Sequence, residues 1–139
     1  MRIMLRRTSI GVPVVLMLLM ISATARIQKM RHISTGSWGG QHISMKVGPK
    51  SATIEYDCAN GMIDGPLVVD ADGHFNLRGT HHTERGGPVR ADETSKGQPA
   101  TYTGSIEGNK MTLTLKLDDL EPETFTLEKG KEGEIFKCK

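Results

Sequence analysis

The chain has 139 residues, a length typical of one domain, and carries 18 Lys and Arg against 16 Asp and Glu. Three of the basic residues, Arg2, Arg6 and Arg7, lie at the start of the chain, and the others are scattered among acidic residues. Because no basic stripe is interleaved with aromatic residues, which make up only 4% of the chain, the sequence argues against a nucleic-acid partner.

Residues 1–25 have the pattern of a secretory signal peptide. The basic start of the chain precedes an apolar run at 10–21, and residues 22–25 supply the small side chains of an A-x-A cleavage site. The apolar run is shorter than the roughly 20 residues that a membrane-spanning helix needs. We therefore expect a signal helix that is cleaved after Ala25, export to the periplasm or the cell exterior, and no membrane span in the mature chain. An uncleaved N-terminal anchor or a buried helix is the alternative interpretation.

The rest of the chain is expected to form one β-domain over residues 36–139, preceded by a polar, flexible lead-in at 26–35. Apolar and polar side chains alternate with a period of two between turn residues, a pattern that indicates half-buried strands. The alternating segments are 43–47, 52–58, 67–69, 75–78, 100–107, 111–117, 125–127 and 135–138. Turns are expected at 48–50, 60–61, 70–73, 107–109 and 129–130.

Eight short strands joined by short connections predict an antiparallel meander, and closure into an eight-stranded up-and-down barrel would remove its exposed edges. A two-sheet β-sandwich is the alternative. The predicted inward-facing side chains are Ile43, Met45, Val47, Ile54, Tyr56, Leu67, Val69, Phe75, Leu77, Tyr102, Ile106, Met111, Leu113, Leu115, Phe125 and Leu127. Because these side chains are medium to large, we expect them to fill the barrel and to leave no sizeable cavity.

One segment, residues 83–98, is polar, rich in Gly and charge, and has almost nothing to bury. Loops of this length inside a small domain are either functional or merely flexible, and the sequence leaves both open. As a functional loop it would recognise a partner through exposed side chains of the loop and of the preceding strand. These candidate partner-binding residues are His81, His82, Arg85, Arg90, Asp92 and Glu93.

The two cysteines, Cys58 and Cys138, form an even pair in a chain that is expected to enter an oxidising compartment. Such a pair is expected to form a disulfide, which would tie an early strand to the end of the chain. The alternative, a reactive thiol, needs a neighbouring His or a helix N-terminus, and neither cysteine has such a sequence context.

Two resemblances extend this interpretation. Gly36-Ser37-Trp38 resembles the G-x-W motif that opens the lipocalins and related calycin barrels, which implies that Trp38 plugs one end of a barrel. More broadly, residues 36–42, 54–61, 86–90, 104–111 and 137–138 resemble a family of small exported bacterial proteins of uncharacterised function. That resemblance implies export and a compact β-domain, and it transfers no activity and no catalytic residue.

Histidines raise the question of a metal site. Zinc needs three or four ligands in a fixed tetrahedron, but adjacent His81 and His82 on a strand would point to opposite faces. No H-x-H, H-E-x-x-H or C-x-x-C spacing connects His42 or His74 to a second ligand. Residues 70–73 contain only a fragment of a calcium loop and are better interpreted as a turn. We therefore expect neither a metal ion nor a cofactor.

Catalysis is not expected either. Ser37 and Ser44 flank His42 without a G-x-S-x-G elbow, and Glu55 and Asp57 are expected to share one strand face, which is ordinary for an exposed strand. The favoured function is a monomeric, non-catalytic module that binds a protein or a cell-envelope component. One alternative is a lipocalin-like carrier of a small apolar ligand. The other is an enzyme that uses His42, which convergence of this residue with Glu55, Asp57 or His81 would favour.

Overall fold

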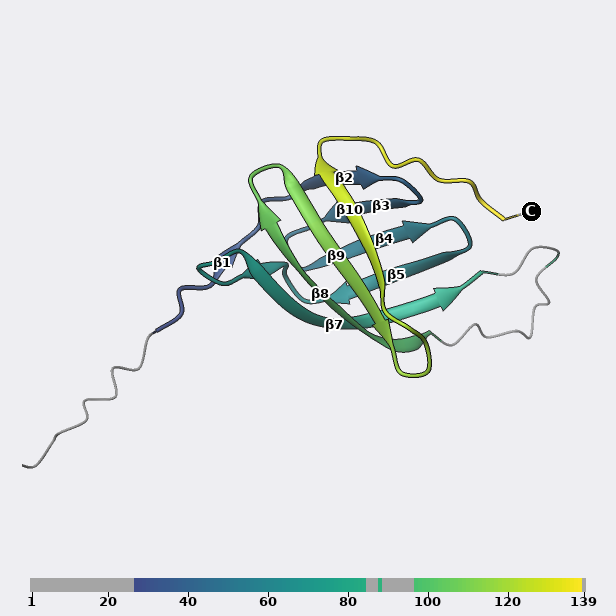
Figure 1. Cartoon of the computed structure of the whole chain (residues 1–139), viewed down its shortest axis with the longest axis horizontal. Helices are drawn as coiled ribbons and strands as arrows, with labels where there is room; N and C mark the ends of the chain where they lie inside the picture. Colours follow the sequence, from purple (N-terminus) through teal and green to yellow (C-terminus); the bar gives the residue numbers. More distant parts are fainter. Residues whose placement is uncertain (1–26, 85–87, 89–96, 139) are drawn as a thin grey trace, which may run out of the picture.

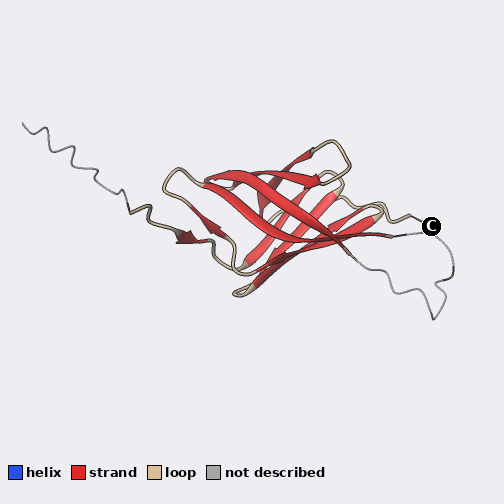
Figure 2. Ribbon diagram, turned by 90° about the horizontal axis from the view of Figure 1, so that it is seen from below, coloured by secondary structure: helices blue, strands red, loops and turns tan. Residues whose placement is uncertain are grey.

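The computed structural model describes residues 27–84, 88 and 97–138, and all of the regular structure in these residues is β (Figure 1, Figure 2). Eight antiparallel strands close into a barrel. The predicted eight-stranded barrel is therefore confirmed, and the sandwich alternative is wrong. No helix long and apolar enough to cross a membrane occurs in the described residues. The expected signal helix, residues 1–25, lies outside them.

Each barrel strand pairs with the next barrel strand along the chain, and the last pairs with the first (Figure 1). The barrel strands are β2 (Gly36–Gly40), β3 (Ile43–Val47), β4 (Ser51–Tyr56), β5 (Ala59–Asp64), β7 (His74–Thr83), β8 (Gln98–Glu107), β9 (Lys110–Leu117) and β10 (Glu123–Lys129). Two further strands, β1 (Arg31–His32) and β6 (Val68–Val69), pair only with each other. The barrel is thus an up-and-down meander with a small ribbon beside it.

The predicted number of barrel strands is right, but two of the predicted segments are not barrel strands. Residues 67–69 contribute to β6, outside the barrel, and residues 135–138 form no strand. The strands that the alternation did not indicate are β2 and β5. Residues 60–61, predicted as a turn, lie inside β5, where a Cβ atom on Gly61 would collide with the Tyr102 hydroxyl. Glycines at such close approaches interrupt the apolar pattern of a strand that is nevertheless half-buried.

Part of the expected lead-in is attached to the barrel. Arg31 and His32 pair with β6, and the Ile33 N–H donates to the Leu67 carbonyl oxygen at 2.9 Å. Ile33 also packs against the core. Strand β6 of this ribbon is part of the β5–β7 connection. The ribbon therefore lies at the end of the barrel that also holds the β3–β4 and β8–β9 turns, which we call the closed end. The opposite end, with the β2–β3, β4–β5 and β9–β10 turns, is the open end.

The core is built from the inward-facing positions of the strands. All of the predicted inward side chains are buried except Leu77 and Phe125, which are partly buried and pack against the core. The core also contains Trp38, Ala52, Ala59, Ile63, Ala100 and Leu117. Trp38 is only 2% exposed, so its predicted burial is confirmed. Its role as a plug at one barrel end stays a prediction.

Replacing Trp38 by Ala is expected to lower the free energy of unfolding by about 3–5 kcal/mol, because a large buried ring is lost. Trp38→Phe, which keeps an aromatic ring, should lose less. Since the chain has a single Trp, its fluorescence reports this site alone, and urea unfolding should shift the emission to longer wavelength. A native emission maximum already at the position of exposed indole would contradict the burial.

Candidate functional site

A cavity of about 680 Å³ lies at the open end of the barrel. Its lining residues come from the turns and strand ends there: Gln41, His42, Tyr56, Asp57, Cys58, Ala59, His81, Thr83, Leu115, Glu123, Thr124, Phe125 and Thr126. The expectation of an interior without a sizeable cavity is therefore wrong. The side chains do fill the rest of the barrel, but at this end the inward positions include small residues such as Ala59 and Thr83.

The cavity also depends on how the barrel closes. Strand β10 pairs with β9 over six residue pairs but with β2 over only two, Glu128 with Gly39 and Lys129 with Trp38. The first half of β10 therefore has no ladder to β2. Residues 124–126 of this half line the cavity together with Gln41 and His42. Strand β2 ends at Gly40, so no strand ladder covers the start of β10 on this side.

Aromatic rings form part of the cavity wall. The ring of Tyr56, at the end of β4, has its centroid 5.3 Å from the ring centroid of Phe125 on β10 and 5.5 Å from that of His81 on β7. Both contacts are tilted, a geometry that aromatic pairs favour. Leu115 adds an aliphatic side chain from β9. Four strands therefore contribute to this wall, three of them with a ring.

Two buried polar atoms at this wall have no hydrogen-bond partner. They are the Tyr56 hydroxyl and Nδ1 of His81, on side chains that are only 6% and 9% exposed. The nearby Tyr102 hydroxyl, in contrast, donates to the Thr80 carbonyl oxygen at 2.7 Å. Leaving a buried polar group unpaired costs about 1–3 kcal/mol, and native proteins pair most of them. Of the three such atoms in the described residues, these two lie beside the cavity and are available to a ligand, whereas the third, Nε1 of Trp38, does not line it.

Both groups are uncharged at neutral pH. Burial lowers the pKa of His81, an effect to which His82 adds and which Glu123 opposes. It also raises the pKa of Tyr56, with the neighbouring Tyr102 hydroxyl as the next cause and Glu123 contributing. Neutral imidazole offers one donor and one acceptor, and a phenol offers both at one oxygen.

The sequence-predicted partner-binding residues are not all where they were expected. His81 is buried and faces the barrel interior, because alternate residues of β7 point inward. Its predicted exposure is therefore wrong, and its role in binding a partner stays a prediction. His82 is half-buried on the other face, as the alternation predicted. Arg85, Arg90, Asp92 and Glu93 lie outside the described residues, and partner recognition by this loop stays a prediction.

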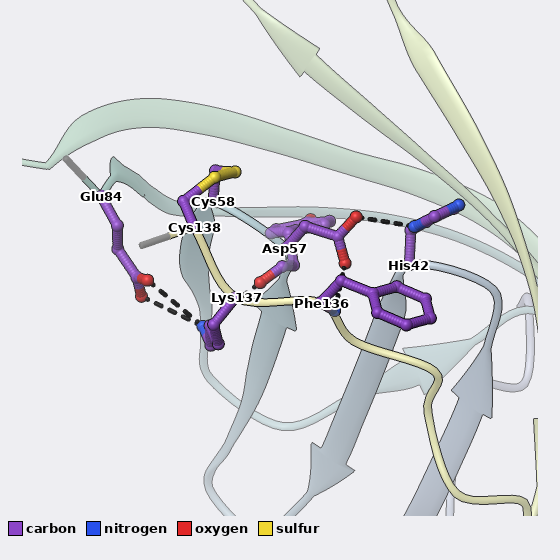
Figure 3. Close-up of a disulfide and its surroundings, with 8 residues drawn as sticks. His42, Asp57, Cys58, Glu84, Phe136, Lys137 and Cys138 are labelled. Carbon is purple, nitrogen blue, oxygen red and sulfur yellow. Dashed lines mark hydrogen bonds and ion pairs between the residues drawn. A yellow bond between two sulfur atoms is a disulfide. The ribbon is translucent and has the colours of Figure 1, made fainter. Parts of the chain in front are cut away.

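His42 and Asp57 meet at the rim of the cavity (Figure 3). His42 occupies the tight β2–β3 turn with a φ of 62°, and its Nδ1 lies 2.6 Å from an Asp57 carboxylate oxygen. The other carboxylate oxygen accepts the Phe136 N–H at 2.9 Å. This N–H, and after it His42, holds the pKa of Asp57 below its usual range. The predicted shared strand face of Glu55 and Asp57 is wrong, because β4 ends at Tyr56 with Glu55 on its outer face and Asp57 in the turn.

Residues 131–138, which we call the C-terminal strap, run from the end of β10 along the β2–β3 turn to the β4–β5 turn (Figure 1, Figure 3). The Glu134 N–H donates to the Gly40 carbonyl oxygen at 3.0 Å, and the Glu134 carbonyl oxygen accepts the His42 N–H at 2.9 Å. The strap ends at the Cys58–Cys138 disulfide, whose Cα atoms are 5.2 Å apart. The predicted disulfide is therefore confirmed, and it fastens the strap to a turn that lines the cavity.

Next to the disulfide, Lys137 fastens the strap a second time (Figure 3). Its Nζ donates to the Tyr56 carbonyl oxygen at 3.2 Å and lies 3.3 Å from the Glu84 carboxylate. Glu84 also accepts a hydrogen bond from the Asn60 side chain at 2.9 Å, and this bond is the largest cause of its lowered pKa. The ammonium of Lys137 is thus already engaged with groups of the rim.

Asp70, Asp72 and His74 form a separate cluster of groups that could ligate a metal ion, near the closed end of the barrel. One Asp70 carboxylate oxygen accepts the backbone N–H groups of both Asp72 and His74 at 2.9 Å. Gly73 in this segment has a φ of 82°. The predicted turn at residues 70–73 is confirmed, and its acidic side chain serves the turn itself.

The fold thus gathers Tyr56, His81, Glu123 and Phe125 from three strands around one cavity. No protein-family model, curated protein or solved structure matches this chain. Sequence reasoning did not connect these four residues as a site. The available signal was that Tyr56 and His81, both able to hydrogen-bond, occupy inward-facing positions near the same end of a predicted barrel.

The free energy of unfolding is expected to fall between pH 7 and pH 5 because of His81. In the unfolded chain this histidine takes up a proton around its ordinary pKa of 6.5, whereas in the folded protein its pKa is lowered. The unfolded state then binds more protons, so stability is lost as the pH falls through this window. The pKa values of Asp57 and Glu84 are lowered from 3.8 and 4.5, so these carboxylates lose their stabilising effect only at lower pH.

Urea denaturation at several pH values between 7.5 and 5 measures this dependence. His81→Gln should flatten it, and His74→Gln, at an exposed position near the closed end, should not. An unchanged slope in His81→Gln would show that His81 is not held neutral by burial.

Free-thiol titration of the unfolded, unreduced protein is expected to find no thiol, because both cysteines are paired. Replacing both cysteines by Ser should lower the free energy of unfolding by up to about 4.5 kcal/mol, since the unfolded chain then loses a cross-link that closes a long loop. Two reactive thiols per chain would contradict the disulfide.

Proposed function

We propose that the protein binds a small, largely apolar molecule in the cavity at the open end of the barrel and does not convert it. The observation that carries this proposal is the pair of buried, unpartnered polar atoms, the Tyr56 hydroxyl and His81 Nδ1, beside a cavity of about 680 Å³. Ligand sites of roughly 300–1,000 Å³ typically combine apolar and aromatic walls with a few polar groups that orient the ligand. Tyr56, Ala59, Leu115 and Phe125 form the apolar part of this lining, and polar side chains form much of the rest.

A lipocalin-like carrier of a small ligand is therefore favoured over a module that recognises a protein or a cell-envelope component. The carrier alternative requires open apolar space inside the barrel, and the cavity supports it. The Cys58–Cys138 disulfide is compatible with an oxidising, exported location. The function therefore fits a small binding protein outside the cytoplasm.

An enzyme remains the second candidate, because His42 and Asp57 converge at 2.6 Å on the cavity rim. An imidazole oriented by a carboxylate can act as a general base. The same contacts also have a structural use, since Asp57 accepts the Phe136 N–H and so holds the C-terminal strap. Turnover of a bound ligand that is lost in His42→Gln would favour the enzyme over the binding protein.

Binding of the neutral fluorescent probe N-phenyl-1-naphthylamine tests the proposed function. The protein should bind about one probe per chain with micromolar affinity, and Thr83→Trp should weaken binding at least about tenfold by filling the cavity. Thr112→Trp, the same substitution on the outer face of β9, should leave binding unchanged. No binding to the unmodified protein, or equal effects of the two substitutions, would overturn the proposal.

A further inference from the structure

Resting on the proposed function, this inference concerns the charge of the ligand. Glu123 lies at the start of β10, two residues before Phe125 and four before the fully buried Leu127. Because successive strand residues alternate between faces, Glu123 is on the inward-facing side of β10. It lines the cavity, and the described residues contain no ion-pair partner for it. The Glu123 side chain is exposed at the barrel mouth, where its carboxylate can interact with a ligand that enters.

The described lining of the cavity contains neither Lys nor Arg. His42 at the rim is paired with Asp57, and Lys137 approaches from the strap, where it is paired with Glu84. Of the two carboxylates that line the cavity, Asp57 is already engaged by His42 and by the Phe136 N–H. Glu123 is therefore the lining carboxylate that has no partner among the described residues and can interact with a bound ligand.

The influence of Glu123 extends to the two unpartnered groups. Its negative charge raises the pKa of His81 against the effect of burial, and it adds to the raised pKa of Tyr56. These three groups therefore share one electrostatic environment. A carboxylate ligand placed beside Tyr56 and His81 would meet this negative charge without a compensating cation in the described wall.

A protonated amine fits the same wall. Its N–H groups can donate to the Glu123 carboxylate, to the Tyr56 oxygen and to a ring nitrogen of neutral His81, all of which can accept. The rings of Tyr56 and Phe125, 5.3 Å apart, offer π-faces that attract an organic cation and apolar surface for its body. The hydrogen-bonding groups, the carboxylate and the rings then contribute to binding together.

We infer that the cavity selects an organic cation, a protonated amine carried on an aromatic or aliphatic body, with Glu123 as the residue that determines charge preference and Tyr56 and His81 as hydrogen-bond acceptors. Fatty acids and other apolar carboxylates are disfavoured. Charge selection and binding are separable, because the apolar wall remains when Glu123 is neutralised.

Three competitors with the same phenyl body test this selection at pH 7.4 and physiological salt: 2-phenylethylamine, which is cationic, 2-phenylethanol, which is neutral, and 3-phenylpropionate, which is anionic. Each displaces N-phenyl-1-naphthylamine from the protein with its disulfide formed. The amine is expected to reach half-displacement at a concentration at least about tenfold below that of the carboxylate, with the alcohol between them.

Glu123→Gln should reduce this ratio to less than about threefold while the neutral probe still binds. Glu121→Gln, an exposed neighbour in the β9–β10 turn that does not line the cavity, should keep the full ratio. Equal competition by amine and carboxylate, no displacement by the amine, or a full ratio in Glu123→Gln would overturn the inference. If the probe still binds in these cases, the proposed function is unaffected and only the charge preference is wrong. If the unmodified protein does not bind the probe, the proposed function itself is wrong.

Discussion

Closure of the barrel through β10 and β2 is the constraint on which the rest of the structure depends. Seven of the eight strand junctions are continuous ladders between chain neighbours, but this one joins the two ends of the meander through only two residue pairs. Near the closed end those two pairs join β10 to β2 beside Trp38, whose side chain is buried in the core. Toward the open end the ladder stops with the end of β2, and the unpaired start of β10 lines the cavity.

The C-terminal strap compensates for this short junction. It continues from β10 past Gly39, where a Cβ atom would collide with the strap backbone, and bonds to both sides of the β2–β3 turn. Asp57 anchors the strap with two acceptor interactions: its carboxylate accepts the Phe136 N–H, and its carbonyl oxygen accepts the Cys138 N–H at 3.2 Å. The same carboxylate contacts His42 of the β2–β3 turn. The strap is therefore both a substitute for the missing ladder and the frame of the rim.

Much of the fold could be predicted from period-2 alternation because six barrel strands keep their apolar residues on one face. The pattern failed where close backbone approach replaces a side chain with glycine, as at Gly39 and Gly40 in β2 and at Gly61 in β5. Cys58 and Cys138 could be paired because only two cysteines are present. The site could not be derived in this way, since it depends on where the β10–β2 ladder ends and on a strap that brings residue 136 to residue 57.

The disulfide gives the chain a mechanical asymmetry. Residues 58 and 138 close a covalent ring that contains β5 to β10, while β1 to β4 lie outside it. Tension applied at the two ends of the described chain would pass directly through the sulfur–sulfur bond, and the strands within the ring would carry none of it. Only β1 to β4 could be drawn out, so the molecule would extend by the length of that segment alone. The wall with His81, Glu123 and Phe125 lies within the shielded part, whereas Tyr56 lies just outside it.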